Sequence, residues 1–308
     1  MEAMQKLTCN GLTWVDIQNP SKKDITALKR IHNLHPLVAE ELLLPTYRPR
    51  IEMYDEQMFL VLHFPIRAKR GERHTSTHEI DFIIGKTYLT TTHYGEVAVL
   101  KKLYNKLTGN ESLCKQNFGS NSGYILHYII SELFTMVLEE LDKFAVEIEK
   151  VEALLQKKHN AEEIVEAISS LRYELLDYRK ALKPQQTVLN SLKERGKIFF
   201  ENHMGPYLSD ITGEYVRVWD ALENHKDTLE ALNNTNESLL SSRSNEIMRR
   251  LTIMAFITFP LTLIASIFGM NTRWLPFAGN QNDFWIIFGI MIFGVLFMFG
   301  YFKSRHWL

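Results

Sequence analysis

The sequence predicts an α+β membrane protein with an α/β domain at the amino terminus, long coiled-coil and stalk helices after it, and two transmembrane helices at the carboxyl terminus. Three patterns predict this class. Residues 1–120 contain short runs in which apolar and polar side chains alternate, as they do in half-buried strands. From residue 121 the apolar residues recur about every 3.5 positions, which is the period of packed helices. Residues 251–270 and 284–302 contain no charged side chain.

The composition limits the class of protein. A chain of 308 residues has room for about two domains. The formal net charge of -1 gives no reason to expect a nucleic-acid partner. Cys9 and Cys114 lie far apart in the sequence, so we expect reduced thiols rather than a disulfide or half of a zinc site. We expect no organic cofactor, because the sequence has no Gly-rich phosphate loop and no nucleophile motif.

Residues 1–120 are predicted to form the α/β domain. Helices are expected over Lys22–Asn33 and, after a break at His35-Pro36, over Leu37–Leu44. Asn19-Pro20-Ser21 supplies a turn and a cap for the first of them. Residues 67–77 are expected to form a solvated loop. The expected strands share the period of two and cover residues 12–17, 51–54, 58–64, 79–84 and 88–92.

Residues 121–204 are predicted to form a helical hairpin. The first helix is expected to have roughly 35 residues and to end near Lys158. The second, Ala161 to about Lys193, is interrupted at Pro184 and is expected to pack antiparallel to the first. The acidic residues of the first helix are expected to form a solvated face, and a surface that senses divalent cations is the alternative. The apolar stripe of the first helix contains Leu126, Ile130, Leu133, Val137, Leu141, Phe144, Ile148, Val151 and Leu155.

Residues 205–250 are predicted to form a stalk helix that runs directly into the first span, residues 251–270. No proline occurs between Tyr207 and Pro260, so a continuous helix is expected from about Leu208 to Met270. At about 1.5 Å per residue, the uncharged segment 251–270 is roughly 30 Å long, which matches the hydrocarbon thickness of a bilayer. Such a helix would carry the state of the amino-terminal domain into the membrane.

Basic residues predict the orientation of the two spans. Arg249 and Arg250 precede the first span, and Lys303 and Arg305 follow the second. The loop between the spans, residues 271–283, contains only one basic residue, Arg273. Segments that flank membrane spans on the cytoplasmic side are enriched in Lys and Arg. We therefore expect both termini, including the basic tail 303–308, to lie in the cytoplasm. The hairpin is expected to lie in the inner membrane of the cell. The opening residues lack the apolar core of a signal peptide.

One stripe of the first span has the composition of a pore lining. Its members recur at steps of three and four, and small or oxygen-bearing side chains alternate with larger apolar ones. Ordinary helix packing is the alternative, because small and hydroxylated residues also mediate contacts between membrane helices. A single hairpin encloses nothing, so a pore would need several copies of the chain. The stripe contains Asn245, Met248, Thr252, Ala255, Phe259, Thr262 and Ser266, and Leu251 lies beside it.

Gly269-Met270-Asn271 closes the first span at its outer end. The amide carbonyl of Asn271 is neutral, and a ring of such oxygens could hold the hydration shell of a divalent cation without removing its water. With several copies around an axis, Met248, Leu251 and Phe259 are expected to form apolar constrictions that can close by excluding water. Pro260 removes the hydrogen bond to the Phe256 carbonyl, and that carbonyl then needs water or a neighbour.

With these residues in view, the chain resembles the CorA family of magnesium and cobalt transporters. The resemblance extends over essentially the whole chain and lies in Gly269-Met270-Asn271 after LTIMAFITFPLTLIASIF, in the closing YFKSRHWL, and in LTWVDIQNP, NLHPLVAEELL, RPRIEMYDEQMFLVL and EIDFIIGKTYLTTTH. This chain departs from the family's pattern at Phe259, Ser266 and Phe268. Its outer loop also lacks the glutamate that many members carry just after the equivalent of Pro276.

The resemblance implies a funnel-shaped homopentamer embedded in the lipid bilayer. It implies passive Mg2+ influx driven by the membrane potential, with Co2+ and Ni2+ as further permeant ions and closure when cytoplasmic Mg2+ binds between subunits. Carried over by motif, Gly269, Met270 and Asn271 select the ion. Asn245 and Thr262 form polar pore rings, and Met248 and Leu251 form the gate. The regulatory metal ligands stay unassigned.

Two alternatives remain open from the sequence. A zinc-transporting branch of the superfamily has the same architecture, although the proposed stripe contains neither the His nor the Cys ligands that zinc prefers. A membrane-anchored enzyme or scaffold is the other alternative. The pairs His74/His78 and His32/His35 are the best metal candidates for it, and neither has the spacing and context of a metalloenzyme motif. Asp81 is expected to have a structural role rather than a regulatory one.

Overall fold

The computed structural model describes residues 4–54, 56–67, 75–156, 161–270 and 282–305. The chain divides into a first unit, Met1–Leu232, and a second unit, Asn233–Leu308. The long helix α8, Gly205–Phe268, begins in the first unit and ends in the second. The continuous helix expected from about Leu208 to Met270 is therefore confirmed.

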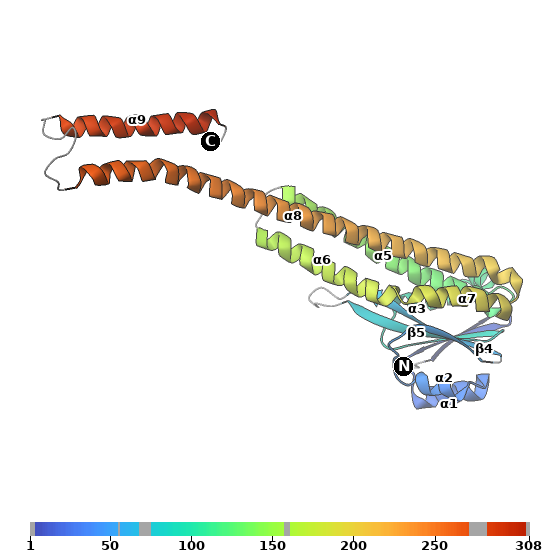
Figure 1. The fold of residues 1–308 in the computed structure, drawn as a ribbon. Helices are drawn as coiled ribbons and strands as arrows, with labels where there is room; N and C mark the ends of the chain where they lie inside the picture. Colours follow the sequence, from blue (N-terminus) through green and yellow to red (C-terminus); the bar gives the residue numbers. More distant parts are fainter. Residues whose placement is uncertain (1–3, 55, 68–74, 157–160, 271–281, 306–308) are drawn as a thin grey trace. The chain divides into compact units, whose positions relative to one another are not determined.

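A mixed sheet forms the centre of the first unit (Figure 1). Within the described residues it has six strands in the order β1-β2-β6-β5-β4-β3. All neighbouring strands are antiparallel except β2 and β6, which are parallel. The strands are β1 Met4–Cys9, β2 Leu12–Gln18, β3 Arg50–Tyr54, β4 Gln57–Ile66, β5 Ser76–Ile84 and β6 Tyr88–His93.

Two short helices, α1 Lys22–His32 and α2 Pro36–Glu41, cover one face of the sheet (Figure 1). Ser21 caps α1 through a capping box with Asp24, as the sequence predicted for this turn. Burial of apolar side chains holds this layer together, because Ile25 and Leu28 of α1 pack on strand residues such as Ile17.

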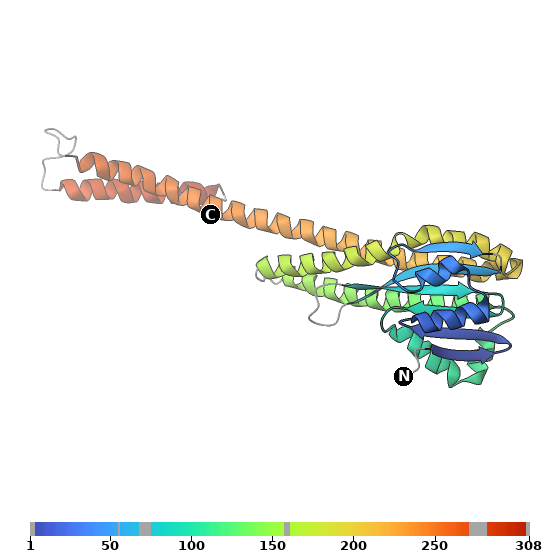
Figure 2. The ribbon, with the colours of Figure 1, turned by 90° about the horizontal axis from the view of Figure 1, so that it is seen from below.

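The other face of the sheet carries the long helices α5, α6 and α7 and the first part of α8 (Figures 1 and 2). The described apolar core on this face runs continuously from Trp14 in β2 to Leu229 in α8. The helices are α3 Ala98–Thr108, α4 Glu111–Asn117, α5 Ser122–Gln156, α6 Ala161–Leu182 and α7 Gln185–Phe199, followed by the 3-10 turn η1 Asn202–Met204.

The predicted hairpin is confirmed by α5 and α6. The α5 helix has 35 residues, and the apolar stripe expected from the sequence is buried along its whole length. The rings of Phe144 and Tyr178 meet edge to face at 5.3 Å between the two helices. At the end of β4, the Arg67 guanidinium donates to Glu147 of α5 at 2.6 Å and to Glu174 of α6 at 2.9 Å. Part of the acidic surface of α5 therefore serves to join elements.

Several predicted boundaries were wrong. The sequence prediction omitted β1, α3 and α4, and it placed Ser76 and Thr77 in a loop although β5 begins at Ser76. β1 is an edge strand with half-buried and exposed residues, so it lacks a strong apolar alternation. The helix expected over Leu37–Leu44 ends at Glu41.

In the second unit, the carboxyl-terminal part of α8 lies beside α9, Asp283–Ser304 (Figures 1 and 2). The rings of Phe256 and Phe302 approach each other at 6.4 Å between the two helices. Both helices are long and apolar enough to span a membrane. In the most apolar stretch of each helix, only 6% is buried in α8 and none in α9. A core helix of a soluble domain would be mostly buried, so this exposure favours two membrane spans.

Asp81 lies in the sheet beside a second carboxyl group, Glu79. Its Oδ2 accepts a hydrogen bond from the Thr92 hydroxyl at 2.9 Å, and its side chain is almost fully buried. Glu79 accepts from the backbone amide of Thr46 at 2.5 Å and lies 3.4 Å from His63 Nε2. Burial and the charge of Glu79 raise the pKa of Asp81 well above its usual value, while Thr92 and Arg50 act in the opposite direction. The contacts fit the structural role expected from the sequence.

The raised pKa of Asp81 predicts a stability that falls as pH rises. A carboxyl group whose pKa is raised in the folded state favours its protonated form there, so its contribution is complete below the unfolded pKa of about 3.8 and is lost as pH rises through the folded pKa. Asp81→Asn removes this titration. We expect the variant to have a melting temperature higher than that of the wild type by about 2 °C or more at pH 8 but not at pH 5. Equal pH slopes in thermal unfolding of the two proteins would contradict this.

Candidate functional site

The predicted pore stripe lies on an exposed surface of α8. Met248, Leu251 and Phe259 are 60%, 55% and 73% exposed in the single chain. Asn245, Thr252, Thr262 and Ser266 are also exposed, and Ala255 is half-buried. Large apolar side chains with this exposure need a cover of lipid or protein.

The stripe residues and the residues that meet α9 occupy different positions around α8. Ile253, which is 4% exposed, and Phe256, which contacts Phe302, mark the side that packs on α9. At about 100° per residue, Thr252, Phe259 and Ser266 project more than a quarter turn away from Ile253. The contact with α9 buries Ile253 and leaves the oxygen-bearing residues of the stripe exposed in the single chain.

The threonine hydroxyls of the stripe donate hydrogen bonds to backbone carbonyls of the same helix. Thr252 donates to the Met248 carbonyl at 2.8 Å, and Thr262 donates to the Thr258 carbonyl at 2.9 Å. A hydroxyl that donates in this way still has oxygen lone pairs to accept a further bond. These side chains thus present acceptors, which suit water or a cation, rather than donors.

The helix continues through Pro260 and ends just before the predicted selectivity motif. The amide of Gly269 donates to the Ala265 carbonyl at 2.9 Å, and the amide of Met270 donates to the Ile267 carbonyl at 3.3 Å. A Cβ on Gly269 would lie 3.0 Å from the Ala265 oxygen, so glycine fits this closing turn without displacement. Met270 is 56% exposed, and Asn271 lies outside the described residues.

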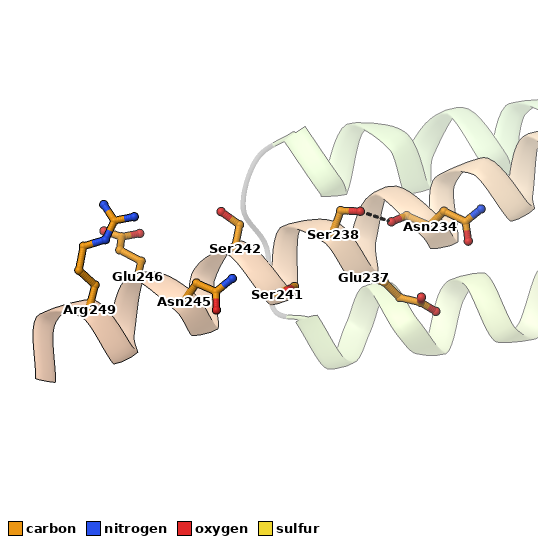
Figure 3. Close-up of a pocket in the computed structure, with 8 residues that line it drawn as sticks. All are labelled: Asn234, Glu237, Ser238, Ser241, Ser242, Asn245, Glu246 and Arg249. Carbon is orange, nitrogen blue, oxygen red and sulfur yellow. Dashed lines mark hydrogen bonds between the residues drawn. The ribbon is translucent and has the colours of Figure 1, made fainter. Parts of the chain in front are cut away.

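A shallow hollow of about 850 Å³ extends along α8 on the amino-terminal side of the stripe (Figure 3). It shares Asn245 with the stripe, and Ser238 within it donates to the Asn234 carbonyl at 2.9 Å. The sequence prediction missed this surface except for Asn245. The signal was present, because Ser241, Ser238 and Asn234 continue the steps of three and four backwards along the chain. The hollow is lined by Asn234, Glu237, Ser238, Ser241, Ser242, Asn245, Glu246 and Arg249.

Two histidine pairs were considered for a metalloenzyme site. In one pair each ring stacks on a different tyrosine, and the other pair lies partly outside the described residues. His32 stacks on Tyr88 at 3.7 Å, and His35 stacks on Tyr54 at 4.4 Å. His74, the proposed partner of His78, is not among the described residues. Over the described ranges, no three His, Cys, Asp or Glu side chains are grouped so that they could hold a metal ion.

The two cysteines are free thiols, as expected, yet they lie together. Burial and a hydrogen bond with Cys9 raise the pKa of Cys114 to about 12. The turn after Cys9 is held against α4, because Asn10 Nδ2 donates to the carbonyls of Lys115 and Phe118, both at 3.1 Å. This contact joins residues more than 100 positions apart, and the sequence contains no signal for it.

Comparison with known proteins decides the family. Residues 10–304 match the family described as CorA-like Mg2+ transporter protein. The chain belongs to the CorA-like Mg2+ transporter family. Since this match covers nearly the whole chain, both the amino-terminal unit and the apolar hairpin are parts of the CorA architecture.

Similar proteins span the same length. The putative metal ion transporter YfjQ of Bacillus subtilis is 26% identical over 96% of this chain and 89% of its own. The cobalt/magnesium transport protein CorA of Thermotoga maritima is 25% identical over 96% of this chain and 83% of its own. The complete structure of the CorA magnesium transporter from Methanocaldococcus jannaschii has a TM-score of 0.83 at 22% identity, and the match covers 96% of this chain and 92% of that one. This structural likeness confirms the predicted fold class.

Proposed function

We propose that this CorA-family protein is a homopentameric channel for passive, membrane-potential-driven Mg2+ influx that also admits Co2+ and Ni2+. The exposed, oxygen-bearing stripe of α8 is the observation that carries the proposal. Its residues are exposed in the single chain and not covered by α9, so symmetric copies of the hairpin can surround an axis with these oxygens. The Mg2+ and Co2+ assignment follows the description of the family and the name of the Thermotoga relative.

Within this channel, Gly269, Met270 and Asn271 form the outer selectivity ring. Neutral carbonyl oxygens suit a hydrated Mg2+ ion, because Mg2+ gives up its water reluctantly. Asn245, Thr252, Thr262 and Ser266 form oxygen rings along the path. Met248 and Leu251 form the apolar gate, which closes by excluding water.

The amino-terminal regions control this gate from the cytoplasm. Both termini lie inside, and residues 271–283 face outward, because the basic residues flank the spans on one side. Binding of cytoplasmic Mg2+ between subunits closes the channel. The α/β domain 1–120 and the helical hairpin 121–204 are the sensing part, and residues 205–250 transmit its state. Transport rather than catalysis is then the activity of the chain.

A zinc transporter is the second candidate function. The outer loop contains Arg273 and Asp283 and therefore has no net charge, so it attracts cations weakly. The stripe itself disfavours zinc, since its polar members provide oxygen, whereas zinc prefers nitrogen and sulfur ligands. Transport of Mg2+ and Zn2+ by the same purified protein separates the two candidates.

Thr262→Val tests whether the stripe lines the ion path. Valine keeps the shape of threonine but removes its oxygen, so we expect Mg2+ flux to fall by about three- to tenfold. Thr258→Val is the matched control, because Thr258 also donates to the carbonyl four residues earlier, at 3.0 Å, and lies outside the stripe. Flux into proteoliposomes is measured for both variants. Equal losses, or a loss only in Thr258→Val, would contradict the assignment of the stripe.

A further inference from the structure

A second hollow, of about 560 Å³, lies in the amino-terminal unit, far in sequence from the pore stripe. It is bounded by the last turn of α1, by β1 and β2, and by the start of β6. Val15 and Leu28 form part of its lining and belong to the buried core of this face. The volume is within the usual range of small-molecule sites, about 300–1,000 Å³.

One wall of the hollow is planar and uncharged. The His32 ring stacks on the Tyr88 ring with 3.7 Å between centroids and an interplanar angle of 19°. Burial lowers the pKa of His32 to about 4, and the charge of Lys6 acts in the same direction. The imidazole is therefore neutral at physiological pH. Ile31, beside it in the lining, is 66% exposed, which leaves apolar surface uncovered.

The lining of the hollow also has an excess of positive charge. Lys6 from β1 and Lys86 from the turn before β6 both line it, against one acid, Glu56. The hydroxyl of Tyr88 is buried and has no hydrogen-bond partner among the described residues. Burial, together with Glu56, raises the pKa of Tyr88 to about 12, so this hydroxyl keeps its proton. The positive charge that lines the hollow therefore comes from the two lysines.

We propose that this hollow binds a nucleotide, with the base against His32 and Ile31 and the phosphate between Lys6 and Lys86. Free phosphate would leave the apolar wall exposed, and a bare divalent cation would meet two ammonium groups and a single carboxylate. A flat ring that carries an anion satisfies both halves of the site. The proposal is independent of the pore, so either can fail alone.

The test uses the full-length protein in detergent and adenosine monophosphate as the probe, because this nucleotide chelates Mg2+ weakly. We expect saturable heat in calorimetry with a dissociation constant of about 1 mM or tighter, and binding of inorganic phosphate weaker by about tenfold. The double variant Lys6→Gln/Lys86→Gln should weaken nucleotide binding by about tenfold or more. Both lysines are exposed, so the fold is kept, and unchanged thermal unfolding checks this.

Two controls make the result specific. Lys22→Gln/Lys23→Gln removes two exposed lysines at the other end of α1 and should leave binding unchanged. Tyr88→Phe keeps the ring that stacks on His32 and removes only a buried hydroxyl, so it should also leave binding unchanged. Absence of saturable nucleotide binding to the wild type would overturn the proposal. So would equal weakening by the two lysine double variants, or phosphate binding as tightly as the nucleotide.

Discussion

Asn271→Ala is expected to reduce potential-driven Mg2+ entry by about tenfold or more, because it removes the ring of amide carbonyls that would hold the hydrated ion at the outer mouth. The loss should appear as a lower maximal flux at saturating Mg2+ and not as lower protein abundance. Uptake into proteoliposomes that contain a Mg2+-sensitive dye, with a potential negative inside, measures it directly.

Asn282→Ala is the matched control for this prediction. Asn282 lies at the other end of the outer loop and precedes α9, and its side chain makes no capping hydrogen bond to that helix. Its removal should leave Mg2+ flux within about twofold of the wild type. If Asn271→Ala kept full flux, or if both variants lost flux equally, the outer ring would not select the ion.

Leu251→Ser is expected to raise basal Mg2+ flux at high internal Mg2+ by about tenfold or more, because a hydroxyl in place of an isobutyl group hydrates the constriction that closes by excluding water. Leu251 is 55% exposed near the amino-terminal end of the span. The measurement compares uptake at low and high internal Mg2+, since an open gate should abolish the difference between the two.

Met254→Ser provides the comparison for the gate. Met254 is 63% exposed, one turn further along α8, and projects away from the stripe. We expect Mg2+ flux through the Met254→Ser variant to stay sensitive to internal Mg2+. Unchanged or reduced basal flux in a well-expressed Leu251→Ser variant would remove Leu251 from the gate.

The long helices were predictable because their apolar residues repeat over many turns. The stripe of α5 from Leu126 to Leu155 predicted a helix of the observed length, and the absence of proline before Pro260 predicted α8. The edge strand β1 was missed although Asn10-Gly11, with φ of 49° and 77°, is a strong hairpin signal between β1 and β2. Local sequence therefore contained information about β1 that the apolar alternation did not reveal.

Tertiary contacts were less accessible to sequence analysis. The composition of the pore stripe was visible, but its exposure depends on which residues of α8 meet Phe302, and no periodicity gives that. The meeting of Cys9 with Cys114 and the stacking of His32 on Tyr88 depend on chain topology in the same way. Asn271, the residue on which the selectivity proposal depends most, remains a prediction from its motif.

The most direct test of the central claim is cation entry into proteoliposomes that contain only the purified wild-type protein. An imposed potential, negative inside, should drive Mg2+ entry with no change in a pH-sensitive dye, and Zn2+ should enter more slowly. Zn2+ entry with a proton signal and no Mg2+ entry would contradict the assignment of this chain as a passive Mg2+ channel.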